Sequence, residues 1–139
     1  MNLKRLLVFL IGASSLVVFL SSFQKKPSFD LKASITRGRE VYITYCLSCH
    51  MDQGEGIEGV YPPLAKSDYL AADKNRAIRQ VLYGATGEMT VNGKKYNVDM
   101  SAVDIGNTEV SDVVNYILNS WGNKGGTITP EHVAAQRKK

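Results

Sequence analysis

The sequence contains only two cysteines, Cys46 and Cys49, among its 139 residues. A zinc site with four thiolates needs a second C-x-x-C pair, so the lack of one excludes that class of site. A thioredoxin-like dithiol usually occurs beside a βαβ pattern, and the chain shows no such pattern. These two absences argue against a zinc site and against a thioredoxin-like dithiol at the two cysteines.

The chain also lacks a basic stripe interleaved with aromatic residues, an internal repeat and a low-complexity segment. Its net charge is +4 at pH 7, but Lys4, Arg5 and the three C-terminal residues 137–139 supply five of the 17 basic side chains. Removing these five leaves 12 basic residues against 13 acidic ones. This balance argues against a nucleic-acid partner and predicts that residues 136–139 form a solvated basic tail.

Residues 1–24 read as an export segment. Lys4 and Arg5 precede an apolar run from Leu6 to Phe23, which is typical of a signal peptide. The run is long for a signal peptide and short for a spanning helix, and it lacks a well-formed small-x-small cleavage site. We therefore expect a periplasmic or other extracytoplasmic location, with either a cleaved signal or an uncleaved N-terminal membrane anchor.

The stretch Cys46-Leu47-Ser48-Cys49-His50 has the C-x-x-C-H pattern of c-type haem attachment. Two thiols at this spacing can each add to a vinyl group of one porphyrin, and the following histidine is then delivered to the iron. An exported C-x-x-C pair without haem would tend to oxidise to a strained disulfide. The motif thus predicts one covalent haem c, bound through Cys46 and Cys49, with His50 as an axial ligand.

We expect a linker over residues 25–33 and one domain over residues 34–135. The first helix is predicted to begin near Ser34 or Thr36 and to run into the motif. Its buried face is expected to contain residues at helical spacing, namely Ile35, Gly38, Tyr42, Tyr45 and Cys46.

The remaining pattern predicts an all-α domain with one small β-hairpin. Glycines and prolines make residues 51–64 an irregular loop that can wrap a porphyrin edge. A short turn of helix is expected at 67–70, then a helix capped by Asp73 and ending at Gly84, and a hairpin around Asn92-Gly93. The last clear helix is expected to follow residues 106–108, to carry one apolar stripe and to end at Trp121-Gly122, before a short final turn from Thr129-Pro130.

The identity of the second axial ligand decides much of the function, because a thioether raises the haem potential and an open site permits small-ligand chemistry. Met51 is adjacent to His50 and cannot reach the other face of the ring, and His132 is expected at the surface. Met100 lies in an irregular segment after the hairpin and is the favoured distal ligand. Met89, which begins a hairpin strand, stays as the alternative.

Over residues 34–135 the chain resembles a class I monohaem cytochrome c of the bacterial, exported type. The resemblance rests on the C-x-x-C-H motif, the helix order, Gly38 four residues before Tyr42, and Tyr116 in the last helix. It implies that Gly38 and Tyr42 cross closely against Tyr116. The segment from Tyr96 to Asn123 is similar to bacterial cytochromes of respiratory chains or copper enzymes, although Ser101 stands where family members usually carry proline.

The resemblance also assigns a role to the Pro62-Pro63-Leu64 turn. It resembles the family loop in which a proline carbonyl accepts the proximal histidine's Nδ1–H, and such a bond increases the donor strength of the imidazole. Either Pro62 or Pro63 could provide that carbonyl.

These features predict outer-sphere electron transfer between redox protein partners, with His50 and Met100 both bound to iron, and no enzymatic activity. The partner surface is expected around Met51, Tyr61, Pro62 and the residues near Met100. One alternative is a haem-based sensor or enzyme with a labile distal site. The other is a fixed electron-entry subunit of a larger complex.

Overall fold

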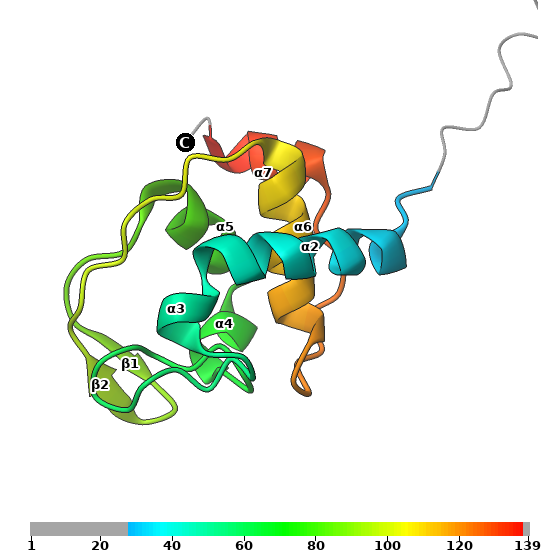
Figure 1. The fold of residues 1–139 in the computed structure, drawn as a ribbon. Coiled ribbons are helices and arrows are strands. Elements are labelled where there is room, and N and C mark those ends of the chain that lie inside the picture. Colours follow the sequence, from blue (N-terminus) through cyan, green and yellow to red (C-terminus); the bar gives the residue numbers. More distant parts are fainter. Residues whose placement is uncertain (1–27, 138–139) are drawn as a thin grey trace, which may run out of the picture.

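The computed structural model describes residues 28–137, so the predicted export segment lies outside the described residues. Helices dominate, and the one sheet in this part of the chain is a two-stranded hairpin, as predicted (Figure 1). The elements, in chain order, are α2 (Leu31–Tyr45), α3 (Leu47–His50), α4 (Asp68–Ala72), α5 (Lys74–Tyr83), β1 (Met89–Val91), β2 (Lys94–Tyr96), α6 (Asn107–Asn119) and α7 (Pro130–Arg137).

Helix α2 begins earlier than the sequence analysis predicted. Its N-cap is Asp30, whose side chain accepts a hydrogen bond of 3.0 Å from the amide of Ala33. Residues 31–33 of the expected linker therefore belong to the helix. A carboxylate at the N-cap satisfies an otherwise unpaired amide, which explains why the helix begins at this aspartate.

The buried face of α2 follows residues four apart, and it differs in part from the predicted one. Ser34, Gly38, Tyr42 and Cys46 are buried, whereas Tyr45 is half exposed. The predicted burial of Tyr45 was wrong because α2 packs along a single ridge of residues at i, i+4 and i+8. Tyr45 points to the side of that ridge.

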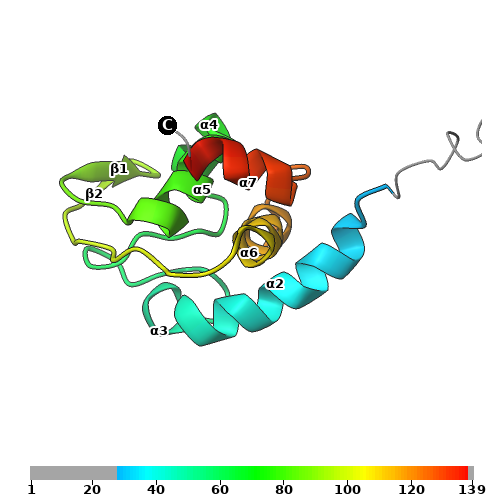
Figure 2. The ribbon, with the colours of Figure 1, turned by 90° about the horizontal axis from the view of Figure 1, so that it is seen from above.

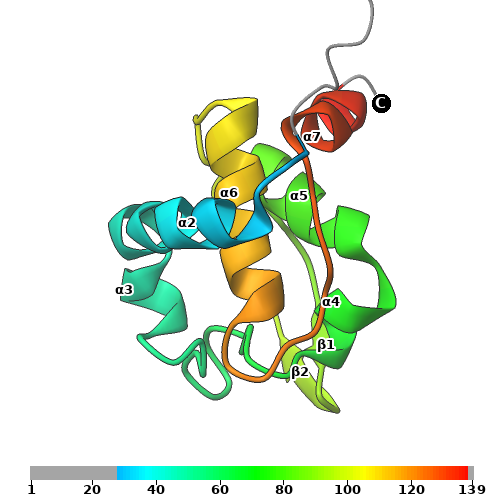
Figure 3. The same cartoon turned by 90° about the vertical axis from the view of Figure 1, so that its right-hand side faces the viewer.

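Helices α2 and α6 cross at Gly38 (Figures 1 and 3). A Cβ atom at this position would overlap the backbone carbonyl of Asp112. Below the crossing, the rings of Tyr42, Tyr116 and Trp121 pack in a triangle with centroids 5.2–5.3 Å apart. The predicted close approach of Gly38 and Tyr42 to Tyr116 is thus present, and Trp121 joins it.

A buried polar cluster also joins α2 to α6, and no local pattern in the sequence predicts it. The Asp112 carboxylate accepts a hydrogen bond of 2.6 Å from the Ser34 hydroxyl and two, of 2.7 and 2.8 Å, from the Arg37 guanidinium. Asn115 donates to Ser34 and exchanges two hydrogen bonds with the backbone of Ile128. Each buried polar group thereby has a partner, as burial requires.

The second half of the helical frame matches the predictions from local signals. Asp73 caps α5 through the amide of Asn75, and α5 ends at Gly84. Asn92 and Gly93 have φ values of 50° and 76°, as a type I′ turn requires, and Met89 pairs with Tyr96. Helix α5 packs against α6 and α7, which close the core from the other side (Figure 2).

The C-terminal part differs from the predicted boundaries. Helix α6 ends at Asn119, two residues before Trp121, which has φ 52°. The predicted short final turn is an eight-residue helix, α7. Of the predicted basic tail, Gln136 is buried and so is not solvated, whereas Arg137 is exposed and donates to the carbonyl of Ile105.

The interior is one apolar cluster drawn mainly from α5, α6 and the segment before α7. Its most deeply buried members include Tyr42, Ile78, Val110, Val113, Val114, Ile128 and Val133. Within residues 28–137, no helix has both the length and the apolar character needed to span a membrane.

Candidate functional site

The C-x-x-C-H motif forms one helical turn at the end of α2. Cys46 closes α2 and opens α3, and its carbonyl accepts hydrogen bonds from the amides of Cys49 (3.2 Å) and His50 (2.9 Å). Residues three apart lie on one side of such a turn, so both thiols face the same way. Neither is in a disulfide, and burial raises the pKa of the Cys46 thiol to about 11.

The imidazole of His50 is fixed by the carbonyl of Pro62, which lies 3.0 Å from Nδ1. A carbonyl can only accept, so Nδ1 carries the proton and Nε2 keeps its lone pair in the neutral ring. Burial lowers the pKa of His50, and the bond to Pro62 opposes that shift. Between the two prolines considered from sequence, the hydrogen bond is to Pro62, and Pro63 offers His50 none in the described structure.

The loop after His50 is irregular, as predicted, but closely tied together. Tyr42 donates from its hydroxyl to the carbonyl of Met51 at 2.6 Å, and Met51 itself has φ 63°. The amide of Gly56 donates a hydrogen bond of 3.0 Å to the His50 carbonyl. At Gly54, a Cβ would lie 2.6 Å from the Trp121 ring, so the loop packs directly against the aromatic triangle.

Met100 lies in the segment between β2 and α6, which runs along the same edge of the molecule as α3 (Figures 1 and 2). Its backbone is paired with Ala85 through two hydrogen bonds, of 2.8 and 2.9 Å. Gly84, at φ 77°, allows this approach, because a Cβ there would overlap the carbonyl oxygen of Met100. The sequence indicated Gly84 only as a helix stop and missed this second role.

Replacing Gly84 by alanine should therefore disturb the Met100 segment. A side chain at this positive φ costs about 1–3 kcal/mol, and the overlap with Met100 adds to that cost. We expect a loss of unfolding free energy of about 3 kcal/mol, measured by denaturant titration. Gly87→Ala is the matched control, since Gly87 has φ 81° and no atom within 4 Å of its Cβ position. Equal effects from both substitutions would show that contact with Met100 is unimportant.

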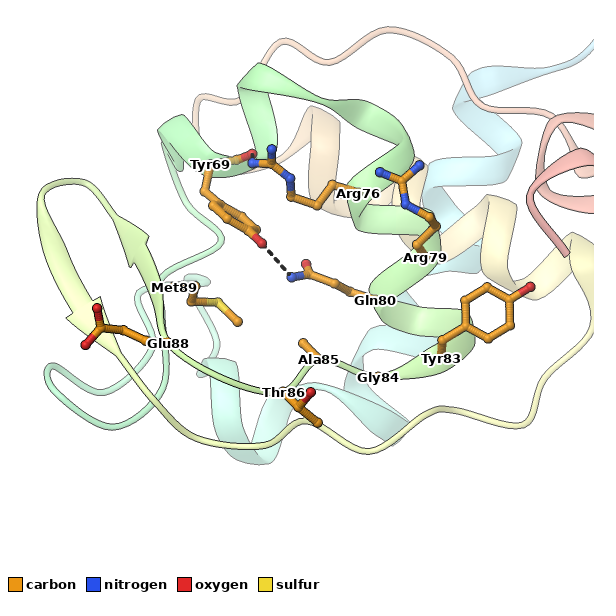
Figure 4. A pocket seen from close by; sticks show the side chains of 10 residues that line it. All are labelled: Tyr69, Arg76, Arg79, Gln80, Tyr83, Gly84, Ala85, Thr86, Glu88 and Met89. Atoms are coloured by element: carbon orange, nitrogen blue, oxygen red, sulfur yellow. Dashed lines mark hydrogen bonds between the residues drawn. The ribbon is translucent and has the colours of Figure 1, made fainter. Parts of the chain in front are cut away.

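Met89 lines a pocket of about 260 Å³ beside α5, and Gly84 and Ala85 line the same pocket (Figure 4). The α5 residues that line it, Arg76, Gln80 and Tyr83 among them, lie about half a turn around the helix from the core-facing residues such as Ile78. Figure 4 shows the Met89 thioether pointing into this pocket near Gln80. Met89 thus lies beside the outer face of α5.

The remaining candidate ligand, His132, lies at the surface, as predicted. His132 is exposed on α7, where its Nε2 lies 2.8 Å from the side-chain oxygen of Asn75. In residues 28–137, no group of three or more histidine, cysteine or acidic side chains is arranged to hold a metal ion. The available donor set is therefore a histidine beside two thiols.

The sequence of this chain matches that of a known family. A family model described as cytochrome c matches residues 35–121. The chain belongs to the cytochrome c family. Members carry a covalently bound haem c and act in electron transfer, and this chain has the single haem of a class I monohaem domain. The two free thiols on one turn and the oriented His50 ring fit such a group.

Two kinds of relative are similar to this cytochrome. Cytochrome c-552 of Thermus thermophilus is 33% identical over 125 residues, covering 73% of this chain and 95% of that protein. The cytochrome c subunit of alcohol dehydrogenase (quinone) from Gluconobacter oxydans (strain 621H) is 29% identical over 103 residues, covering 72% of this chain but 22% of that subunit. The gluconate 2-dehydrogenase cytochrome c subunit of Pantoea cypripedii is 34% identical over 106 residues, with 73% and 24% covered.

Proposed function

We propose that this cytochrome is a one-electron carrier outside the cytoplasm, in which Cys46 and Cys49 would hold the haem through thioether bonds and His50 and Met100 would be the ligands of its iron. The bound haem supplies an iron that takes up and releases a single electron. The chain has no catalytic residue in this proposal. Its side chains hold the group, set its ligands and keep water from it.

The observation that carries the proposal is the hydrogen bond from His50 Nδ1 to Pro62, at 3.0 Å. It leaves the Nε2 lone pair available for a metal, next to two free thiols on the same turn. Metal-ligating histidines usually donate their other ring N–H to a carbonyl or carboxylate, which fixes the ring and increases its basicity. The ring of His50 is prepared in this way for an axial bond.

Two observations support Met100 over Met89 as the distal ligand. The backbone of Met100 is held by Ala85 and Gly84 on the edge shared with α3. Met89 instead lines the pocket on the outer face of α5 (Figure 4). A thioether at the sixth position favours ferrous iron and closes the site to small ligands, so it suits a carrier rather than a sensor.

The proposed partner surface lies on the loop that follows His50. Ile57 and Val60 are 38% and 45% exposed, and they adjoin the half-buried Tyr61 and Pro62. Transient redox complexes bury little area, so a few apolar side chains around a haem edge suffice for an encounter. Redox proteins are the expected donor and acceptor.

A second candidate role is that of a fixed electron-entry component of a larger complex. The similarity of this chain to the cytochrome c subunits of two dehydrogenases favours this role. The match covers about a quarter of each subunit, as one domain of a larger protein would. An uncleaved residue 1–24 segment would hold the domain at a membrane in this role. The mass of the mature protein distinguishes an anchored form from a freely diffusing one.

The test of the proposed function is voltammetry on the exported, purified protein. We expect one reversible one-electron wave, with haem that stays on the chain after denaturation, and loss of that retention in a Cys46→Ala, Cys49→Ala double variant. A wave that becomes catalytic when a small substrate such as peroxide is added would point to an enzyme instead.

A further inference from the structure

The side chain of Asn123 connects the end of α6 to the loop that carries Pro62. Its Nδ2 donates to the carbonyls of Ile117 at 2.7 Å and Leu64 at 3.0 Å, and its Oδ1 accepts from the amide of Lys66 at 2.7 Å. Figures 1 and 3 show the turn after α6 beside the end of the loop that joins α3 to α4. One side chain therefore fixes two points of the loop, two and four residues beyond Pro62.

The segment from Pro62 to Lys66 is thereby held from two sides. On one side, the carbonyl of Gly54 accepts from the amides of Leu64 at 2.7 Å and Ala65 at 2.9 Å. On the other side lies Asn123. Lys66 has φ 50°, an unfavourable conformation for a residue with a side chain, and such a conformation persists only where the surroundings impose it.

We propose that Asn123 is a positioning residue for His50, acting through Pro62. By fixing Leu64 and Lys66, it sets the place of the Pro62 carbonyl and so the strength of the hydrogen bond to His50 Nδ1. A stronger bond makes the imidazole a better donor to iron, which stabilises the ferric form and lowers the reduction potential. This inference rests on the proposed function, in which His50 is an axial ligand.

A purely structural role would be the capping of α6. The Ile117 carbonyl belongs to the last turn and needs a donor, which Asn123 supplies. Loss of a cap lowers stability but leaves the haem potential unchanged. Asn119 provides a matched control, because its Nδ2 donates to the carbonyls of Asn115 at 2.8 Å and Gly126 at 2.9 Å, with no hydrogen bond to residues 62–66 in the described structure.

The experiment compares the holoproteins of Asn123→Ala, Asn123→Ser and Asn119→Ala with the parent. Potentiometric titration should give a higher reduction potential for Asn123→Ala than for the parent, with a smaller rise for Asn123→Ser, whose hydroxyl replaces part of the hydrogen bonding. By NMR, exchange of the His50 Nδ1 proton with solvent should accelerate by roughly tenfold in Asn123→Ala. Asn119→Ala should keep the parent potential and the parent exchange rate.

The outcomes separate this inference from the function on which it rests. A parent-like potential and exchange rate in both Asn123 variants, or an equal rise in Asn119→Ala, would overturn the role of Asn123. If Asn123→Ala does not fold, the less disruptive Asn123→Ser decides by the same two measurements. Failure of the proposed function would show in the parent itself, as ferric and ferrous spectra without a histidine bound to iron.

Discussion

Replacing Gly38 by alanine is expected to lower the unfolding free energy by about 3 kcal/mol, and the midpoint of thermal unfolding by roughly 15 °C. The reason is that a Cβ at Gly38 would overlap the backbone carbonyl of Asp112 on α6. A backbone atom inside a packed helix cannot rotate aside, so the two helices must separate at their crossing. The effect should exceed the gain of up to about 1 kcal/mol that alanine brings to a helix interior.

Gly106→Ala serves as the control for this substitution. Gly106 precedes α6 with φ −71°, and its Cβ position lies 3.4 Å from the Glu109 carboxylate, so alanine fits there. We expect a change below about 1 kcal/mol at this N-cap. Denaturant titration of both variants measures the difference. If the Gly38→Ala protein is as stable as its parent, α2 and α6 do not pack as closely as described.

Replacing Met100 by alanine is the second change with a large expected effect. It should remove the distal thioether, so the weak red absorption of the ferric protein disappears and the ferrous protein binds carbon monoxide. The reduction potential should fall by on the order of 0.1–0.2 V, within the roughly 0.8 V range over which axial ligands set haem potentials. Visible spectroscopy and potentiometric titration measure these changes.

Met89→Ala is the matched control for the ligand assignment. Met89 is the other methionine of this region, and it lines the pocket on the outer face of α5. Its loss should leave the red absorption and the potential close to those of the parent. Reversal of the two results, with the band lost in Met89→Ala and kept in Met100→Ala, would make Met89 the ligand.

The parts of the fold that the sequence predicted best are those with local signals. Asn92-Gly93 requires a particular turn, and Asp73 and Gly84 mark the ends of α5 through capping and chain reversal. Helix α2 was predicted less well, because several of its faces are equally apolar. Contact with α6 along one ridge decides which side of α2 is buried, so the sequence of α2 alone does not predict that side.

The C-x-x-C-H motif was recognisable from the sequence because its residues are adjacent in the chain. The residues that position the motif and the proposed second ligand are distant in the chain. Pro62 and Pro63 are equivalent in sequence, and only the course of the chain brings one carbonyl to within 3.0 Å of His50 Nδ1. Gly84 contacts Met100, which is 16 residues away, and Asn123 contacts residues 64–66, which are more distant still. These contacts therefore follow from tertiary packing. Asp112 likewise depends on partners 75 and 78 residues away.

The proposed electron carrier requires a closed iron site, with His50 and Met100 as the two ligands. Carbon monoxide titration of the reduced parent protein at neutral pH, with the ferric spectrum recorded on the same sample, tests it most directly. We expect a methionine-to-iron band at the red end of the ferric spectrum and no carbon monoxide binding. Rapid carbon monoxide binding together with absence of that band would contradict it and would favour a small-ligand sensor or enzyme.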